Sequence, residues 1–261
     1  MDNKRESYGA ISTIYDNINA RVDYSAWADF FEKCFDKYLV CRPELVLDLA
    51  CGTGSMTFEL ASRGYDMIGI DGSHDMLNVA YDRKYDLELP HDVLLLLQDM
   101  REFELYGTVG AITCCLDSIN YLTEDGELER VFSLAHNYLD PDGLFLFDVN
   151  TPHKFKNIYG GKTYVYEEDD CKQDAFCIWQ NYFDEESKLC DFALTVFEKN
   201  EGSDSYSRRD ELQTERCYSK EKLESTLEGA GFEVIGIYSD FEFSPAHEDD
   251  ERWYFVARAK K

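Results

Sequence analysis

The chain of 261 residues is strongly acidic, with 53 Asp and Glu against 26 Lys and Arg and a formal net charge of -27. A field of this sign repels DNA and RNA, so we expect no nucleic-acid partner. It favours a small-molecule or cationic substrate, unless the acidity serves only solubility. Hydrophobic residues make up 44% and aromatic residues 15%. This apolar content excludes a disordered chain and allows one large α/β domain, or a domain with an insert.

Cysteine usage and hydropathy point to a cytoplasmic protein. The nine cysteines are scattered and show no CxxC pair, which argues against a disulfide framework and against a zinc site. The N-terminal MDNKRESYGA has no apolar segment, and apolar runs such as 93–97 are too short to cross a bilayer. We therefore expect no metal, no membrane association, and a monomer or homodimer.

Residues 1–150 alternate between two periodicities. Residues 1–40 are predicted to form a helical cap, because aromatic side chains recur at three- and four-residue spacing. Residues 41–150 contain short apolar runs, each typical of a buried strand, with helical segments between them. The expected strands are 45–49, 65–70, 93–97, 109–116 and 144–149. The expected helices are 55–63, one capped by Ser73, and one capped by Thr123 that runs to Leu139 before a turn at 140–143. This alternation requires a parallel sheet with helices on both faces.

After residue 150 the pattern changes. Residues 151–217 are polar with alternating stretches, and Phe192, Leu194 and Val196 fall on one face, so we expect an inserted antiparallel β lid with an exposed turn at 201–204. Residues 218–261 are predicted to add a helix at 219–231 and two strands, at 232–238 and 253–259, that complete the core sheet. The prediction is a doubly wound α/β domain with a seven-stranded mixed sheet.

A glycine loop follows the first expected strand, in the run VLDLACGTGSMT at residues 46–57. Gly52 and Gly54 lack Cβ atoms, so backbone amides can approach a ligand closely. The N-terminus of the next helix adds partial positive charge. Many nucleotide sites share such a loop, and alone it predicts only an adenosyl-type ligand.

Carboxylates near the ends of three successive strands make the prediction more specific. Asp71 lies about twenty residues beyond the loop, where a carboxylate accepts bonds from ribose hydroxyls. Asp99 follows the third strand, where a carboxylate can accept a bond from the adenine amine. Asp48 ends the first strand. Each alone is also typical of an ordinary strand end, but the three together favour a nucleotide-type site.

A dinucleotide site of an NAD(P)-dependent oxidoreductase is the main alternative. It also needs a glycine loop and an acid at this spacing. Its third Gly or Ala is replaced here by the β-branched Thr57, and Asp48 would repel a pyrophosphate. These two residues argue against the alternative.

Five motifs in order resemble class I S-adenosylmethionine-dependent methyltransferases. They are VLDLACGTG, IGIDGSHDML, LLLQDMREF, AITCCLDSINYL and LDPDGLFLFDVN, and the similarity continues in AGFEV and WYFVARA. The resemblance is closest to small-molecule N-methyltransferases of the glycine and aminosugar type. It implies a Rossmann-like fold, S-adenosyl-L-methionine as cofactor, and methyl transfer to a nitrogen or oxygen of a small molecule. A non-catalytic module that only binds this cofactor is a further alternative, which a turnover assay distinguishes.

The resemblance also implies a set of cofactor-binding residues. The methionine part would contact Tyr15, Arg21, Ala50, Gly52 and Gly54, the ribose Asp71, the adenine Gly72, Met76, Asp99 and Met100, and the sulfonium Cys115 and Leu116.

Catalytic candidates come from the chemistry of methyl transfer. An amine nucleophile must lose a proton, and Asp117 and Asn120, which follow the fourth strand, are placed to assist. Tyr15 is the preferred aromatic residue to face a sulfonium or ammonium. For Asp117 and Asn120, loop hydrogen bonding is the alternative reading.

Overall fold

The computed structural model describes residues 19, 21–170, 173–200 and 202–261. In this part of the chain the N-terminal cap contributes α2 (Tyr24–Tyr38). The expected helical cap over residues 1–40 is wrong for the described residues before Tyr24, which are not helical. Asp23 accepts the backbone N–H of Ala26 at 2.9 Å and thereby caps the helix where it begins. The buried face of α2 carries Trp27, Ala28, Phe30, Phe31, Cys34 and Phe35.

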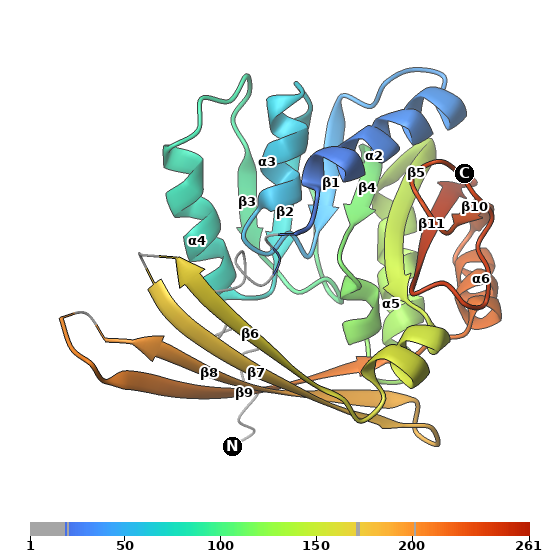
Figure 1. Cartoon of the computed structure of the whole chain (residues 1–261). Helices are drawn as coiled ribbons and strands as arrows, with labels where there is room; N and C mark the ends of the chain where they lie inside the picture. The colour runs from blue at the N-terminus through green and yellow to red at the C-terminus, as the bar shows by residue number, and fades with distance from the viewer. Residues whose placement is uncertain (1–18, 20, 171–172, 201) are drawn as a thin grey trace.

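The core is a mixed sheet of seven strands, as predicted, in the order β10-β11-β5-β4-β1-β2-β3 (Figure 1). The strand β11 is antiparallel to both β5 and β10, and the remaining neighbours pair in parallel. The strands are β1 (Leu45–Leu49), β2 (Asp66–Asp71), β3 (Leu94–Leu97), β4 (Val109–Cys114), β5 (Leu139–Asn150), β10 (Phe232–Tyr238) and β11 (Arg252–Ala259).

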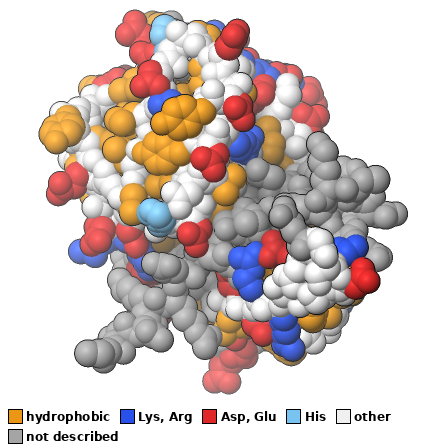
Figure 2. Space-filling model, turned by 90° about the vertical axis from the view of Figure 1, so that its left-hand side faces the viewer, with side chains coloured by type: hydrophobic (Ala, Val, Ile, Leu, Met, Phe, Trp, Pro, Cys, Tyr) orange, Lys and Arg blue, Asp and Glu red, His pale blue; other side chains and the backbone are white. Residues whose placement is uncertain are grey.

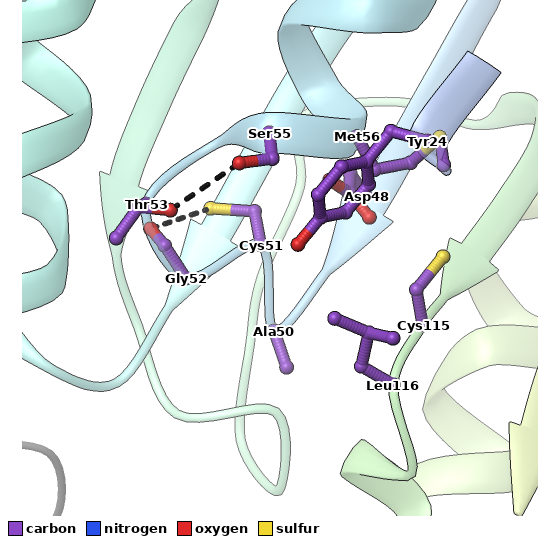
Figure 3. Close-up of a pocket in the computed structure, with 10 residues that line it drawn as sticks. All are labelled: Tyr24, Asp48, Ala50, Cys51, Gly52, Thr53, Ser55, Met56, Cys115 and Leu116. Atoms are coloured by element: carbon purple, nitrogen blue, oxygen red, sulfur yellow. Dashed lines mark hydrogen bonds between the residues drawn. The ribbon is translucent and has the colours of Figure 1, made fainter. Parts of the chain in front are cut away.

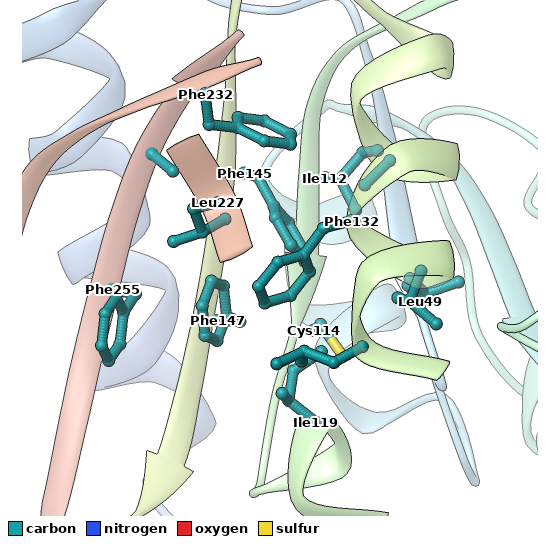
Figure 4. Close-up of a cluster of buried hydrophobic side chains, with 14 of the residues drawn as sticks. Leu49, Ile112, Cys114, Ile119, Phe132, Phe145, Phe147, Leu227, Phe232 and Phe255 are labelled. Atoms are coloured by element: carbon teal, nitrogen blue, oxygen red, sulfur yellow. The ribbon is translucent and has the colours of Figure 1, made fainter. Parts of the chain in front are cut away.

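Helices cover both faces of this sheet, which confirms the doubly wound prediction. One hydrophobic cluster contains α5 (Glu127–Tyr138) and α6 (Lys220–Gly229). The other contains α2, α3 (Ser55–Ser62) and α4 (His74–Tyr85). Figure 4 shows Phe132 of α5 against Phe145 and Phe147 of β5, and the Phe147 and Phe255 rings stack at 4.9 Å. The buried aromatic side chains fix the helices on the sheet.

A second sheet lies across the edge of the core where the parallel strands end (Figure 1). It is antiparallel, in the order β6-β7-β8-β9, and it is inserted between β5 and α6 as predicted. A π-helical turn, η2 (Lys154–Tyr159), leads into it. Its strands are β6 (Thr163–Asp170), β7 (Gln173–Asp184), β8 (Leu189–Lys199) and β9 (Tyr206–Arg216).

Two local predictions are wrong. The expected turn at 140–143 lies inside β5, because the register with β4 jumps from Val109–Leu139 to Ala111–Leu144 and the extra residues form an irregularity in the strand. Asp142 takes a left-handed conformation there, with φ of 62°. Thr123 does not cap α5. The helix begins later, after Gly126 with φ of 86°.

Apolar side chains gather on the outer surface near α4 and β3 (Figure 2). Tyr85 is 88% exposed, and Leu94 and Leu97 are 51% and 55% exposed. Because β3 is an edge strand, this side of the molecule combines an open strand edge with apolar surface. No helix among the described residues is long and apolar enough to cross a membrane.

Candidate functional site

The loop between β1 and α3 has three residues in the left-handed region. Ala50, Gly52 and Gly54 have φ of 60°, 56° and 81°. At Gly54 a Cβ would lie 2.6 Å from the Phe58 ring, so both the conformation and the contact require glycine. Ala50 adopts the same conformation with a Cβ, a strain that concentrates at functional sites.

A pocket opens beside this loop (Figure 3). Tyr24 of α2 extends across it toward the loop, and Cys115 and Leu116, which follow β4, form another wall. The pocket therefore brings together the predicted residues Ala50, Gly52, Cys115 and Leu116. Its lining residues are Tyr24, Asp48, Ala50, Cys51, Gly52, Thr53, Ser55, Met56, Cys115 and Leu116.

Asp71 ends β2 and is bonded to the glycine loop. Its Oδ2 accepts the backbone N–H of Gly52 at 2.8 Å, and its Oδ1 accepts that of Ser73 at 2.7 Å. Burial raises the pKa of Asp71, and these two bonds oppose the rise. A Cβ on Gly72 would lie 3.9 Å from the Asp99 Cα, so the chain after β2 runs beside the chain after β3.

Asp99 forms a double ion pair that sequence reasoning missed. The Arg101 Nε and Nη2 donate to the two Asp99 oxygens at 2.8 and 2.5 Å, and Nη1 donates to Glu127 at 2.8 Å. The Asp-x-Arg spacing of residues 99–101 was the signal in the sequence from which this ion pair could have been predicted. Of the other residues predicted at the adenine, Met76 is buried on α4 and Met100 packs partly buried against the core. The arginine holds the Asp99 carboxylate in one orientation.

Asp48 is buried below the pocket and is held by two hydroxyls. Thr57 Oγ1 donates to it at 2.5 Å and Thr113 Oγ1 at 3.1 Å. Burial, which outweighs these bonds, raises the pKa of Asp48 to about 6. Thr57, the residue that replaces the third glycine, therefore ties α3 to β1.

Beyond Leu116 the chain turns sharply into η1 (Ser118–Tyr121). Leu116 and Asp117 both have φ of 56°. Asp117 donates its backbone N–H to Asp148 at 2.9 Å, and its carboxylate accepts from Arg252 at 2.6 Å. Burial acts to raise the pKa of Asp117, but the positive charges of Arg252 and Lys154 hold it below its usual value.

Asn120 joins the core to the second sheet. Its side-chain oxygen accepts the Asn150 backbone N–H, and its amide donates to the Arg216 carbonyl, both at 2.9 Å. The residue is fully buried. These bonds account for its position, and its catalytic role stays a prediction.

Glu215 of β9 was also missed by sequence reasoning. It is 2% exposed and accepts a bond from Asn150 Nδ2 at 2.9 Å, while Lys154 Nζ donates to the Asn150 oxygen at 2.9 Å. Burial and the neighbouring Asp117 carboxyl raise the pKa of Glu215 well above its usual value. No local motif marks this residue.

Of the two N-terminal candidates, Arg21 alone is among the described residues. Tyr15 lies outside the described residues. Arg21 is exposed before α2, and its charge acts on Tyr166 of β6, where it opposes the rise in pKa that burial causes. The electrostatic effect of Arg21 therefore reaches the second sheet.

Comparison with known proteins identifies the family. A methyltransferase-domain model matches residues 46–143. The chain is 30% identical over 259 residues to "Putative methyltransferase YqeM" of Bacillus subtilis (strain 168), and the match covers 97% of this chain and 98% of that protein. The chain belongs to the methyltransferase family.

A solved structure shares the fold of this methyltransferase, and a further relative matches part of its sequence. An S-adenosylmethionine-dependent methyltransferase of Clostridium acetobutylicum ATCC 824 superposes with a TM-score of 0.85 at 28% identity, covering 97% of this chain and 99% of that one. A dTDP-3-amino-3,6-dideoxy-alpha-D-glucopyranose N,N-dimethyltransferase of Streptomyces fradiae is 34% identical over 103 residues, 40% of this chain and 38% of that protein. The prediction of a class I S-adenosylmethionine-dependent methyltransferase is confirmed, and the oxidoreductase and binding-module alternatives are not favoured.

Proposed function

We propose that the enzyme binds S-adenosylmethionine in the pocket beside the β1–α3 loop and methylates a nitrogen or oxygen of a small molecule held under the second sheet. The observation that carries this proposal is the bond between Gly52 and Asp71, because it brings the carboxylate that we propose to bind the ribose against the glycine loop. Each carboxylate oxygen of Asp71 holds one backbone donor and can accept another bond, so both remain able to receive ribose hydroxyls. The residues in and beside the pocket therefore fit S-adenosylmethionine as the methyl donor.

The proposed contacts follow the geometry of the strand ends. In this proposal Ala50, Gly52 and Gly54 border the methionine part, with Tyr15 and Arg21 retained as further candidates. Asp71 binds the ribose. The adenine lies among Gly72, Met76, Asp99 and Met100, and Cys115 and Leu116 border the sulfonium. When bound, the donor supplies an electrophilic methyl group on a positively charged sulfur, so the chain has to align the nucleophile and exclude water.

The proposed acceptor site lies between the core and the second sheet. Asn120 bonds to the Arg216 carbonyl, and the Tyr121 hydroxyl donates to Gln213 at 2.9 Å, which fixes β9 over the chain that follows β4. A site closed in this way suits a small molecule. The name of the Streptomyces fradiae relative, an aminosugar N,N-dimethyltransferase, supports the same class of acceptor. We propose the division of the chain as a cap (1–40), a cofactor core (41–150), a lid (151–217) and a closing segment (218–261).

Binding and turnover test the proposal separately. Isothermal titration should show binding of S-adenosylmethionine and S-adenosylhomocysteine, and no binding of NADH. Incubation with pools of small amines and alcohols should then yield S-adenosylhomocysteine. If S-adenosylmethionine fails to bind at millimolar concentration while NADH binds, the proposed donor is wrong. Donor binding without turnover of any pool would favour a binding module.

A further inference from the structure

The face of the second sheet that turns toward the core carries a buried carboxyl group. In the register of β8 and β9, Glu215 pairs with Cys190 and Gln213 pairs with Phe192, and all four side chains are buried. Among the described residues of the second sheet, Glu215 is the only charged residue that is buried. A buried ionisable group is costly unless it is paired, so its place on this face needs a physical reason.

Glu215 lies near Asp117, the residue that directly follows Leu116 of the pocket wall. Asn150, whose Nδ2 donates to Glu215, pairs in the β5–β11 register with Arg252, and Arg252 donates to Asp117. Each of the two carboxyl groups affects the pKa of the other. The Asp117 side chain is 18% exposed, and the preceding Leu116 lines the pocket. The pair therefore lies where the proposed donor pocket meets the second sheet.

The basic side chains around the two carboxyl groups neutralise them unequally. Arg252 of β11 bonds to Asp117 and to Asp148 of β5. Lys154 of η2 bonds to the Asn150 oxygen, and its Nζ lies 5.2 Å from the centre of the Tyr159 ring. Among the described residues, no lysine or arginine forms an ion pair with Glu215. Two neighbouring carboxyl groups favour sharing one proton, and the proton favours the group that has no cation of its own, which here is Glu215.

Unsatisfied polar atoms on the same sheet face give an independent sign of a ligand. Asn181 of β7 pairs with Phe192 in the sheet register and is 1% exposed, and its Oδ1 has no hydrogen-bond partner among the described residues. In the same part of the structure the buried Trp179 Nε1 also lacks one. The Trp179 ring contacts Phe192 and Tyr159, with centroids 5.4 and 5.9 Å apart. Buried polar atoms are rarely left unpaired, and a polar small molecule would satisfy this donor and this acceptor.

We propose that the acceptor is an amine, that the Asp117–Glu215 pair binds it as an ammonium ion, and that Glu215 takes the proton from its nitrogen. This inference rests on the proposed function. An ammonium offers both charge and N–H donors to two carboxylates. An alcohol has only one O–H and no charge, and it would leave Glu215 without a cation, because Arg252 is bound to Asp117 and Asp148.

The proposed step balances in protons and electrons. Binding of the ammonium displaces the shared proton to solvent, so that both carboxylates face the cation. One N–H proton then passes to Glu215 and frees the nitrogen lone pair. The lone pair forms the new C–N bond as the C–S bond of the donor breaks, and the sulfur keeps that electron pair as a neutral thioether. The methylated ammonium leaves, and Glu215 keeps its proton for the next cycle.

Sinefungin tests the inference without an identified acceptor. In this analogue an amine-bearing carbon replaces the methylated sulfur, so its ammonium group projects toward the acceptor site. We expect the wild-type enzyme to prefer sinefungin to S-adenosylhomocysteine. In Glu215→Gln and Asp117→Asn this preference should fall by about tenfold, the loss of one charge-assisted contact. Affinity for S-adenosylhomocysteine should stay within about twofold, since that ligand lacks the amine.

The matched control is Asp191→Asn, which removes a carboxylate from the same sheet. Asp191 neighbours Cys190 on β8 and therefore points to the opposite sheet face, where Thr214 donates to it at 2.6 Å. This variant should keep the wild-type preference. A preference unchanged in folded Glu215→Gln and Asp117→Asn would overturn the inference. Failure of the wild-type enzyme to bind S-adenosylhomocysteine would instead overturn the proposed donor.

A proton count on the wild-type enzyme keeps the test independent of variant folding. Titration in buffers of different ionisation enthalpy measures the protons released on binding. At neutral pH sinefungin should release about one proton more than S-adenosylhomocysteine, because its ammonium displaces the proton of the pair. Equal proton release for the two ligands would overturn the inference, whatever the variants show.

Discussion

Gly52 donates its backbone N–H to the Asp71 carboxylate at 2.8 Å, and this bond joins the loop after β1 to the end of β2. Asp71 therefore shapes the glycine loop in addition to its proposed contact with the ribose. It also accepts the Ser73 N–H at the start of α4. A substitution at Asp71 thus changes both the ligand contacts and the loop, and the two effects have to be separated.

Substitution of Asp71 tests its proposed role. Asp71→Ala should weaken binding of S-adenosylhomocysteine by the loss of two ribose bonds, each worth about 1.5–3 kcal/mol for a charged partner. The affinity of Asp71→Asn for S-adenosylhomocysteine should lie between those of wild type and Asp71→Ala, because asparagine keeps one oxygen acceptor but has no charge. Isothermal titration measures both affinities. Asp75→Asn, on the exposed first turn of α4, should bind as wild type. Wild-type affinity in a folded Asp71→Ala protein would refute the ribose assignment.

The sequence was sufficient for features that depend on neighbours in the chain. Asp48, Asp71 and Asp99 could be placed together because each lies at or just after the end of a strand in a parallel sheet, and such strands end at one edge. The position of the antiparallel insert followed from the change in periodicity near residue 150. Ser73 was identified as a cap, and it accepts the Met76 N–H at 3.3 Å.

Features that depend on distant segments were missed. Glu215 and Arg252 reach Asp117 only because β9 and β11 are brought to the end of β4 by the fold, and no spacing in the chain encodes that register. The prediction of a turn at residues 140–143 is wrong for a related reason. Their local preference is met by an irregularity inside β5, which the pairing of the rest of that strand with β4 tolerates.

The bond from Thr57 to Asp48 predicts a stability effect. Thr57→Val keeps the side-chain shape but removes one hydroxyl donor from a carboxyl group that is 1% exposed. We expect a loss of about 1–3 kcal/mol in the free energy of unfolding, the cost of an unsatisfied buried acceptor. Urea denaturation measures it. Thr57→Ser retains the hydroxyl and should recover most of the difference, whereas an equal loss in Thr57→Ser would assign the effect to packing.

The raised pKa of Asp48 predicts a pH dependence. Its folded-state pKa of about 6 exceeds the ordinary value of 3.8, so between these pH values the native state binds more protons than the unfolded state. The contribution of Asp48 to the free energy of unfolding is therefore full below pH 3.8 and is lost as pH rises toward 6.

Comparison with Asp48→Asn isolates this contribution. Relative to the variant, wild-type stability should fall across that window by up to about 3 kcal/mol and then stay constant. Denaturation at a series of pH values measures the difference. Asp66→Asn, at the exposed start of β2, is the control for the loss of a carboxylate from a neighbouring strand. A difference between wild type and Asp48→Asn that does not vary with pH would contradict the prediction.

Arg252 links the acceptor side of the site to the stability of the core. It bonds to Asp117 and also to Asp148, whose side chain is fully buried. Arg252→Met keeps much of the apolar stem but leaves a buried carboxylate without its cation, so the free energy of unfolding should fall by about 3–5 kcal/mol.

A second substitution separates charge from packing at Arg252. Asp148→Asn in the Arg252→Met background removes the uncompensated charge, and it should recover a large part of the lost stability in urea denaturation. Arg258→Met is the matched control, because Arg258 donates to the Tyr38 carbonyl rather than to a carboxylate. Arg258→Met should lower the free energy of unfolding by less than Arg252→Met does. If the double variant is no more stable than Arg252→Met, the arginine acts through its packing, and the carboxylates it holds are not the reason for its position.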